Sequence, residues 1–114
     1  MQFFVVYIRE AHALDGRSPM GGDGMPIVLE PTTYEERCDV AAACMTKLQI
    51  AAIPAVVDGI DNRVSRAYAA APDRLYLVGR DGTIAYHGDR GPFGFKPNEL
   101  EEAIKAELAR RPRP

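Results

Sequence analysis

Two side chains capable of acid–base chemistry, Glu10 and His12, directly follow an apolar run from Phe3 to Ile8. The run contains valine, isoleucine and aromatic residues and no charge, which predicts a strand buried on both faces. In open α/β sheets, functional groups gather at the carboxyl ends of such strands. Residues two apart on a strand share a face, so we expect Glu10 to orient the His12 imidazole through a hydrogen bond. The ordinary alternative for His12 is a loop histidine bonded to backbone.

The two cysteines and His87 also have reactive or titratable side chains, but their positions give weaker indications of a functional site. The two cysteines, Cys38 and Cys44, fall on one predicted helix. Six residues of helix separate their Cα atoms by ~9 Å, beyond the ~7 Å limit for a disulfide. We expect two small buried hydrophobes rather than a redox pair or a metal site. His87 follows a predicted hairpin strand and is expected at the surface.

Composition places the chain among ordinary globular proteins. Its 114 residues suit one domain, 46% are apolar, and the net charge is −2. These values argue against disorder and against nucleic acid as a partner. No apolar stretch approaches the ~20 residues of a membrane span, and Met1 leads almost directly into the first strand without a signal-type segment. A cytoplasmic protein without a membrane partner is therefore expected.

Periodicity and capping residues predict alternating helices and strands. Thr32 and Thr33 each precede a glutamate by three residues, two overlapping capping boxes that begin a helix. Asp81-Gly82 between two apolar runs predicts a hairpin. The predicted helices run from about Thr33 to Gln49, Arg63 to Ala71 and Pro97 to Arg110, and the further strands from Ile53 to Val57, Arg74 to Val78 and Thr83 to Tyr86.

Two glycine- and aspartate-containing segments invite functional interpretations. Asp58-Gly59-Ile60-Asp61-Asn62 lacks the spacing of a calcium loop, so we expect it to cap the following helix. The glycines from Gly88 to Gly94 lack the lysine and the serine or threonine of a phosphate-binding loop, and they are expected to form a bend.

Three segments together resemble one family. They are Val6-Tyr7-Ile8-Arg9-Glu10-Ala11-His12, then Pro54-Ala55-Val56-Val57-Asp58, then Ala67-Tyr68 through Asp73-Arg74-Leu75-Tyr76-Leu77-Val78 to Gly88-Asp89-Arg90-Gly91-Pro92-Phe93-Gly94-Phe95. In this order and spacing they resemble the iodothyronine deiodinases, a selenoprotein family, and in particular its bacterial members. The resemblance covers nearly the whole chain and implies a mixed α/β sheet of the thioredoxin-like fold, in its peroxiredoxin-like branch.

The resemblance also implies a function and a site. In this oxidoreductase chemistry a selenolate or thiolate removes iodide from an aromatic ring and is regenerated by an external thiol reductant, without a bound cofactor or metal. Glu10 and His12 match the functional acid and histidine, and the imidazole would hydrogen-bond the phenol or donate a proton. Arg74 matches an arginine beside the nucleophile in peroxiredoxin-like relatives, and Arg90 matches an arginine implicated in the animal enzymes. A peroxide or a disulfide is an alternative substrate to a small aromatic.

The chain also departs from this family. The strand, the turn with selenocysteine or cysteine, and the helix that precede Met1 in relatives are not in the sequence. We therefore expect a start-truncated domain over residues 1–114, inactive as it stands, whose sheet is split into two strand pairs. Two alternatives remain open. One is a non-catalytic thioredoxin-like interaction module, with a homodimer as one form, and the other is a thiol peroxidase or reductase that uses Cys44.

Overall fold

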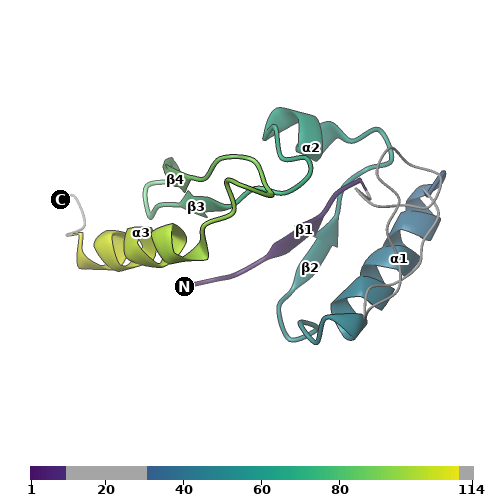
Figure 1. Cartoon of the computed structure of the whole chain (residues 1–114), viewed down its shortest axis with the longest axis horizontal. Helices are drawn as coiled ribbons and strands as arrows, with labels where there is room; N and C mark the ends of the chain where they lie inside the picture. The colour runs from purple at the N-terminus through teal and green to yellow at the C-terminus, as the bar shows by residue number, and fades with distance from the viewer. Residues whose placement is uncertain (10–30, 111–114) are drawn as a thin grey trace. The chain divides into compact units, whose positions relative to one another are not determined.

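The computed structural model describes residues 1–9 and 31–110, which form a small mixed α/β structure. Contacts group the chain into two compact units, Met1–Tyr68 and Ala69–Pro114, and each unit builds its own two-stranded sheet (Figure 1). The predicted α/β class and the predicted split into two strand pairs are confirmed. The single thioredoxin-like domain over residues 1–114 remains a prediction.

The first unit contains a parallel pair, β1 (Val5–Tyr7) and β2 (Ala55–Val57), with Val6 opposite Val56. Pro54 directly precedes β2, and its carbonyl accepts a hydrogen bond from Val5, as expected for a proline at a strand's start. The prediction of a strand buried on both faces is wrong, because Val6 is 43% exposed and Val56 50% exposed. The strand is shorter than the apolar run because it pairs only with the three residues of β2.

The helix α1 (Tyr34–Lys47) contacts β2 and begins where the capping pattern predicts. Thr33 is the N-cap, and its hydroxyl accepts from the backbone N–H of Glu36 at 3.1 Å. Glu36 reaches back one residue further than in a standard capping box, to the backbone N–H of Thr32 at 2.9 Å and its hydroxyl at 3.1 Å. These bonds hold the pKa of Glu36 below its ordinary value. The two overlapping capping boxes predicted from Thr32 and Thr33 therefore form a single cap, with Thr33 as the N-cap residue.

The short helix α2 (Arg63–Ala67) follows the segment Asp58–Asn62, and the predicted capping role of this segment is confirmed. Asp58 lies at the end of β2, and its two carboxylate oxygens accept from the backbone N–H groups of Val64 at 3.0 Å and Ser65 at 2.9 Å. The helix ends earlier than the predicted Ala71, because Ala69 has a φ of 48°, outside the helical region.

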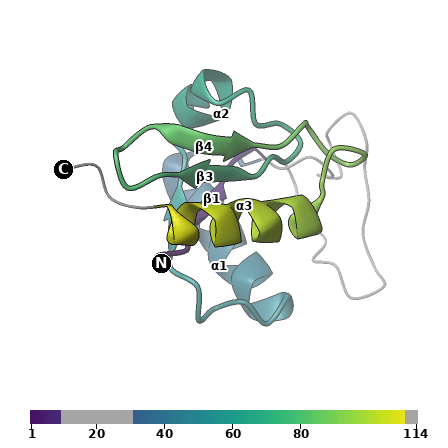
Figure 2. The ribbon, with the colours of Figure 1, turned by 90° about the vertical axis from the view of Figure 1, so that its left-hand side faces the viewer.

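The second unit is an antiparallel hairpin of β3 (Tyr76–Val78) and β4 (Ile84–His87), packed against α3 (Pro97–Ala109) (Figure 2). The predicted hairpin turn forms, with Gly82 at a φ of 82°, a conformation that glycine adopts without strain. Leu77 is buried, and Tyr86 opposite it donates to Glu99 of α3 at 3.2 Å. One face of the hairpin is therefore covered by α3.

The glycine-containing loop after β4 makes a compact bend, as predicted. The Gly91 N–H donates to the carbonyl of Asp73 at 2.9 Å, and the Gly94 N–H donates to the carbonyl of Arg90 at 3.0 Å. A Cβ at Gly94 would meet the backbone of Asp89 at 2.5 Å, closer than real side-chain contacts allow. The glycines therefore permit close approach of backbone to backbone.

Candidate functional site

Of the four residues predicted to form the site, Glu10 and His12 lie outside the described residues. The strand expected to precede them is present as β1, whose last residue, Tyr7, accepts a backbone hydrogen bond from Asp58 at 2.8 Å. The mutual orientation of Glu10 and His12 therefore remains a prediction. The other two residues, Arg74 and Arg90, both belong to the second unit.

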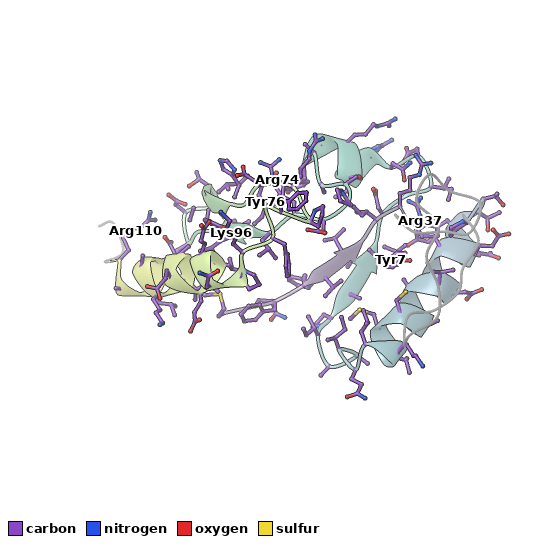
Figure 3. All side chains as sticks on the ribbon, viewed as in Figure 1. Tyr7, Arg37, Arg74, Tyr76, Lys96 and Arg110 are labelled. Atoms are coloured by element: carbon purple, nitrogen blue, oxygen red, sulfur yellow. The ribbon has the colours of Figure 1, made fainter. Side chains whose placement is uncertain are left out.

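Arg74 lies two residues before β3, at the start of the hairpin, where it was predicted. Its Nε donates to the carbonyl of Gly88 at 2.6 Å, and its Nη2 lies 3.2 Å from Nδ1 of His87. Its guanidinium carbon lies 5.3 Å from the centre of the Tyr76 ring, within range of a cation–π interaction (Figure 3). The side chain is therefore held in place by both strands of the hairpin.

Arg90 lies in the loop after β4, and its Nε donates to the carbonyl of Ala69 at 2.9 Å. This contact connects the glycine-containing bend to the segment that leads into the hairpin. Arg74 and Arg90 are thus both anchored at the same end of the hairpin, because Arg74 binds the carbonyl of Gly88, two residues before Arg90.

A tyrosine on the covered face of the hairpin is electrostatically perturbed. Burial, the hydrogen bond to Glu99 and the negative charges of Glu99 and Asp89 together raise the pKa of Tyr86 above its ordinary value of 10.0. Tyr86 therefore remains a neutral hydrogen-bond donor across the physiological range. Its hydroxyl joins β4 to α3 through the hydrogen bond to Glu99.

Both cysteines are free and belong to α1, as predicted, but they are half-buried rather than fully buried. The Cys44 thiol lies 3.9 Å from the Tyr7 hydroxyl on β1. Cys38 lies one turn after Tyr34, and the hydrogen bond to its thiol raises the pKa of the Tyr34 hydroxyl. In the described part of the chain, no three His, Cys, Asp or Glu side chains are grouped so that they could hold a metal ion.

Sequence reasoning missed a buried charged cluster in the first unit. Arg37 of α1 is 1% exposed and Asp58 is 2% exposed. The Arg37 Nη1 donates to the carbonyls of Asp58 at 3.4 Å and Gly59 at 2.7 Å, and its Nη2 donates to Oδ1 of Asn62 at 2.8 Å. Figure 3 labels Arg37 beside α1. This arginine joins the helix to the turn between β2 and α2, and the turn's many polar groups were the only signal for it.

The Arg74–His87 contact was missed as well. His87 is exposed, as expected, but it is the cross-strand partner of Tyr76. Part of the signal was present in the sequence, because Arg74 and Tyr76 are two apart in the predicted strand Arg74–Val78 and would share a face. The partner could not be read from the turn, because an irregularity between Leu77 and Val78 shifts the register and places His87 opposite Tyr76.

Comparison with known proteins gives consistent matches. Residues 1–107 match the family model described as iodothyronine deiodinase. The chain is 35% identical over 111 residues to the type II iodothyronine deiodinase of Petromyzon marinus, covering 96% of this chain and 37% of that protein. It is 39% identical over 106 residues to the thyroxine 5-deiodinase of Sparus aurata, covering 90% and 37%. It is 36% identical over 100 residues to the human thyroxine 5-deiodinase, covering 88% and 31%.

The chain spans about a third of the length of these curated relatives. Across residues 1–9 and 31–110, no helix combines the length and the apolar character needed to cross a membrane. The cytoplasmic location inferred from the absence of such a segment is nevertheless wrong as an inference, because the deiodinases that the chain matches are membrane-associated proteins.

Proposed function

This chain belongs to the iodothyronine deiodinase family, and from that premise we propose that it takes part in reductive dehalogenation of an aromatic ring, driven by a thiol or selenol. The observation that carries the proposal is the family match over residues 1–107, which includes every candidate site residue. The proposed fold is the thioredoxin-like fold in its peroxiredoxin-like branch. The order of helices and strands and the antiparallel hairpin followed by a helix support this assignment.

In the proposed reaction a selenolate or thiolate takes the iodine from the ring, and the ring carbon gains a proton as the carbon–iodine bond breaks. An external thiol releases iodide from the chalcogen, and a second thiol equivalent completes a disulfide, so the two electrons come from the thiols. His12 would hydrogen-bond the phenol or supply the proton, and Glu10 would fix its tautomer. Arg74 and Arg90 would stabilise the thiolate and anionic groups of the substrate.

We propose that the 114-residue chain alone does not perform this reaction. Both of its cysteines lie within α1, and neither occupies a turn between a strand and a helix. The proposal is tested by reading the coding sequence upstream of Met1 for an in-frame cysteine or TGA codon beside proline codons. The product that includes it should release iodide from an iodinated phenol when a dithiol is supplied. An in-frame stop codon directly upstream, or an extended product that releases no iodide, would contradict the proposal.

Cys44 offers the alternative of a thiol peroxidase or reductase. The observation that supports this alternative is the half-buried Cys44 thiol, which lies beside the Tyr7 hydroxyl. Thiol-dependent reduction of a peroxide by the purified chain, lost in Cys44→Ser and retained in Cys38→Ser, would favour it over dehalogenation. We expect no such turnover.

A second candidate function is a non-catalytic interaction module. Each sheet exposes an apolar cross-strand pair on the face away from its helix. Val6 and Val56 are 43% and 50% exposed in the first unit, and Val78 and Ile84 are 57% and 50% exposed in the second. Such faces suit association with a second copy of the chain. Sedimentation equilibrium would show concentration-dependent dimers, weakened by Val56→Lys, and a monomer at all concentrations would exclude this function.

A further inference from the structure

His87 is the last residue of β4 and has no role in the proposed chemistry so far. It lies opposite Tyr76 across the hairpin, with the two ring centres 6.5 Å apart. The neighbouring cross-strand pair, Leu77 and Tyr86, faces α3. Successive residues of a strand alternate between faces, so His87 and Tyr76 belong to the face that α3 does not cover. The imidazole is exposed on that face.

The hydrogen bond between Arg74 and His87 defines where the imidazole carries its proton. Nη2 of Arg74 lies 3.2 Å from Nδ1 of His87. A guanidinium has only donors, so Nδ1 must be the acceptor and cannot carry a hydrogen. A neutral imidazole has one N–H, which must then be at Nε2. A protonated imidazole has no acceptor and could not form this bond at all.

The arginine is itself fixed, so the constraint on His87 is a property of the folded hairpin. The Arg74 Nε donates to the carbonyl of Gly88 at 2.6 Å, and the N–H of Gly88 donates to the carbonyl of Leu75 at 2.9 Å. The guanidinium carbon of Arg74 lies over the Tyr76 ring, 5.3 Å from the ring centre. One guanidinium thus binds the last residue of β4, His87, and the residue that follows it, Gly88. Charge-assisted bonds of this kind are stronger than neutral ones.

We infer that Arg74 is a positioning residue that holds His87 as its Nε2–H tautomer, so that His87 presents a single hydrogen-bond donor to a ligand on the uncovered face of the hairpin. In the described part of the chain, Nδ1 is the one ring nitrogen of His87 with a hydrogen-bond partner. The ligand class rests on the proposed function: the acceptor is the phenol oxygen of a halogenated aromatic compound. The Tyr76 ring, tilted by 38° to the imidazole with the ring centres 6.5 Å apart, provides an aromatic surface beside that donor.

The tautomer is measured directly by long-range proton–nitrogen NMR correlation of the ¹⁵N-labelled 114-residue chain, at a mildly alkaline pH where imidazole is neutral. The His87 signals are assigned by their loss in His87→Gln. We expect the pattern of a protonated Nε2 and an unprotonated Nδ1. In Arg74→Met the signals should move toward those of a free imidazole, whereas Arg80→Met, which removes another hairpin arginine, should leave them unchanged. A protonated Nδ1 in the unsubstituted chain would overturn the inference without any variant.

Ligand contact is tested separately by titrating di-iodophenol into the labelled chain. The Nε2 signal of His87 should shift, and His87→Phe should raise the dissociation constant roughly five- to tenfold, the effect of about one lost hydrogen bond. His87→Gln keeps a donor and should bind more tightly than His87→Phe. An Nε2 signal that does not respond would overturn the assignment of the ligand. Neither readout requires iodide release, so failure of the extended gene product to release iodide would contradict the proposed function and leave the tautomer standing.

Discussion

At the scale of single residues, the buried charges organise the first unit more than its apolar side chains do. Among the described residues of this unit, Ala41 and Met45 are the buried hydrophobic ones, whereas Arg37 and Asp58 are the largest fully buried side chains. A buried charge destabilises a fold unless hydrogen bonds compensate for lost hydration. Asp58 receives two backbone N–H groups and Arg37 binds three oxygen acceptors, which meets that condition. Among the described residues, Nε of Arg37 is the one buried side-chain nitrogen or oxygen without a hydrogen-bond partner.

Replacement of Arg37 by methionine keeps the aliphatic bulk and removes the guanidinium. The carbonyl of Gly59 and the side chain of Asn62 then lose their donor inside the unit. We expect the free energy of unfolding to fall by about 2–3 kcal/mol, the cost of leaving such groups unpaired. Urea denaturation followed by circular dichroism measures the loss. The control is Arg63→Met, because the Arg63 side chain is 83% exposed and its loss should change stability by less than ~0.5 kcal/mol. Equal effects of the two substitutions would contradict the role given to Arg37.

Asp81 in the hairpin turn predicts a dependence of stability on pH. The Asp81 carboxylate accepts hydrogen bonds from the Thr83 hydroxyl at 2.7 Å and from the Thr83 backbone N–H at 3.0 Å. Its Oδ2 lies 3.5 Å from Nη2 of Arg110. These interactions, the hydroxyl bond first, lower the pKa of Asp81 below its ordinary value of 3.8. A lowered pKa in the folded state means that the stabilisation is present above 3.8 and is lost as the pH falls through the folded value.

The measurement is the thermal unfolding midpoint of the chain across the acid range. Asp81→Asn should flatten the decline of the midpoint below the ordinary aspartate pKa, because the substituted side chain no longer titrates. Glu35→Gln, on the first turn of α1, is the matched control and should leave that decline in place. An Asp81→Asn variant with the same acid dependence as the unsubstituted chain would argue against this origin of the effect.

In the candidate site, residue types predicted where the two arginines lie along the chain but not which groups they contact. The position of Arg74 at the start of the hairpin and of Arg90 in the following bend could be predicted, because an Asp-Gly turn between two apolar runs shows where the hairpin lies. The register could not, because an irregularity between Leu77 and Val78 shifts it. Their partners could not, since a backbone carbonyl such as that of Gly88 or Ala69 has no residue-type signature. The burial of Arg37 was missed for the same reason: its three side-chain contacts are to turn residues whose carbonyls and amides have no distinctive pattern in the sequence.

At the scale of elements, local capping determines where the helices begin. Thr33 before α1 and Pro97 at the first turn of α3 were both recognisable in the sequence, and both occupy the expected positions. Element ends depended on tertiary pairing instead. β1 extends only as far as β2 can pair with it, and α2 ends where Ala69 takes a positive φ. The lengths of β1, β2, β3 and α2 were therefore overestimated, whereas β4 has the predicted length but lies one residue later. The type and order of the elements were predicted.

The N-cap of α1 gives the prediction that belongs to this scale. Thr33→Ala removes the hydroxyl that accepts from the Glu36 N–H and should destabilise the chain by about 1 kcal/mol. Thr46→Ala, near the other end of α1, is the control, because alanine in the helix interior is neutral or mildly stabilising. Urea unfolding curves of the two variants distinguish them. A Thr33→Ala variant as stable as Thr46→Ala would show that the cap contributes nothing measurable.

At the scale of the whole molecule, the described structure provides two small sheets and few buried apolar side chains. Ala41, Met45 and Leu77 are the buried hydrophobic residues among those described. A unit with so few must rely on polar networks, such as Arg37 with the β2–α2 turn and Glu107 with the hairpin, where the Arg80 N–H donates to Glu107 Oε1 at 3.0 Å. The match to the deiodinase family model covers residues 1–107 and therefore includes residues of both units. The proposed function accordingly assigns candidate site residues to each of them.

The most direct measurement is thiol-dependent iodide release from an iodothyronine by the full product of the gene, compared between the unsubstituted protein and His12→Asn. If His12 is the proton-donating residue, the substitution should lower kcat by about a hundred- to ten-thousandfold. Arg80→Met, in the hairpin turn and outside the candidate site, should leave kcat within about a factor of two, as expected for a surface substitution. Release that is no more sensitive to His12→Asn than to Arg80→Met would contradict the proposed site.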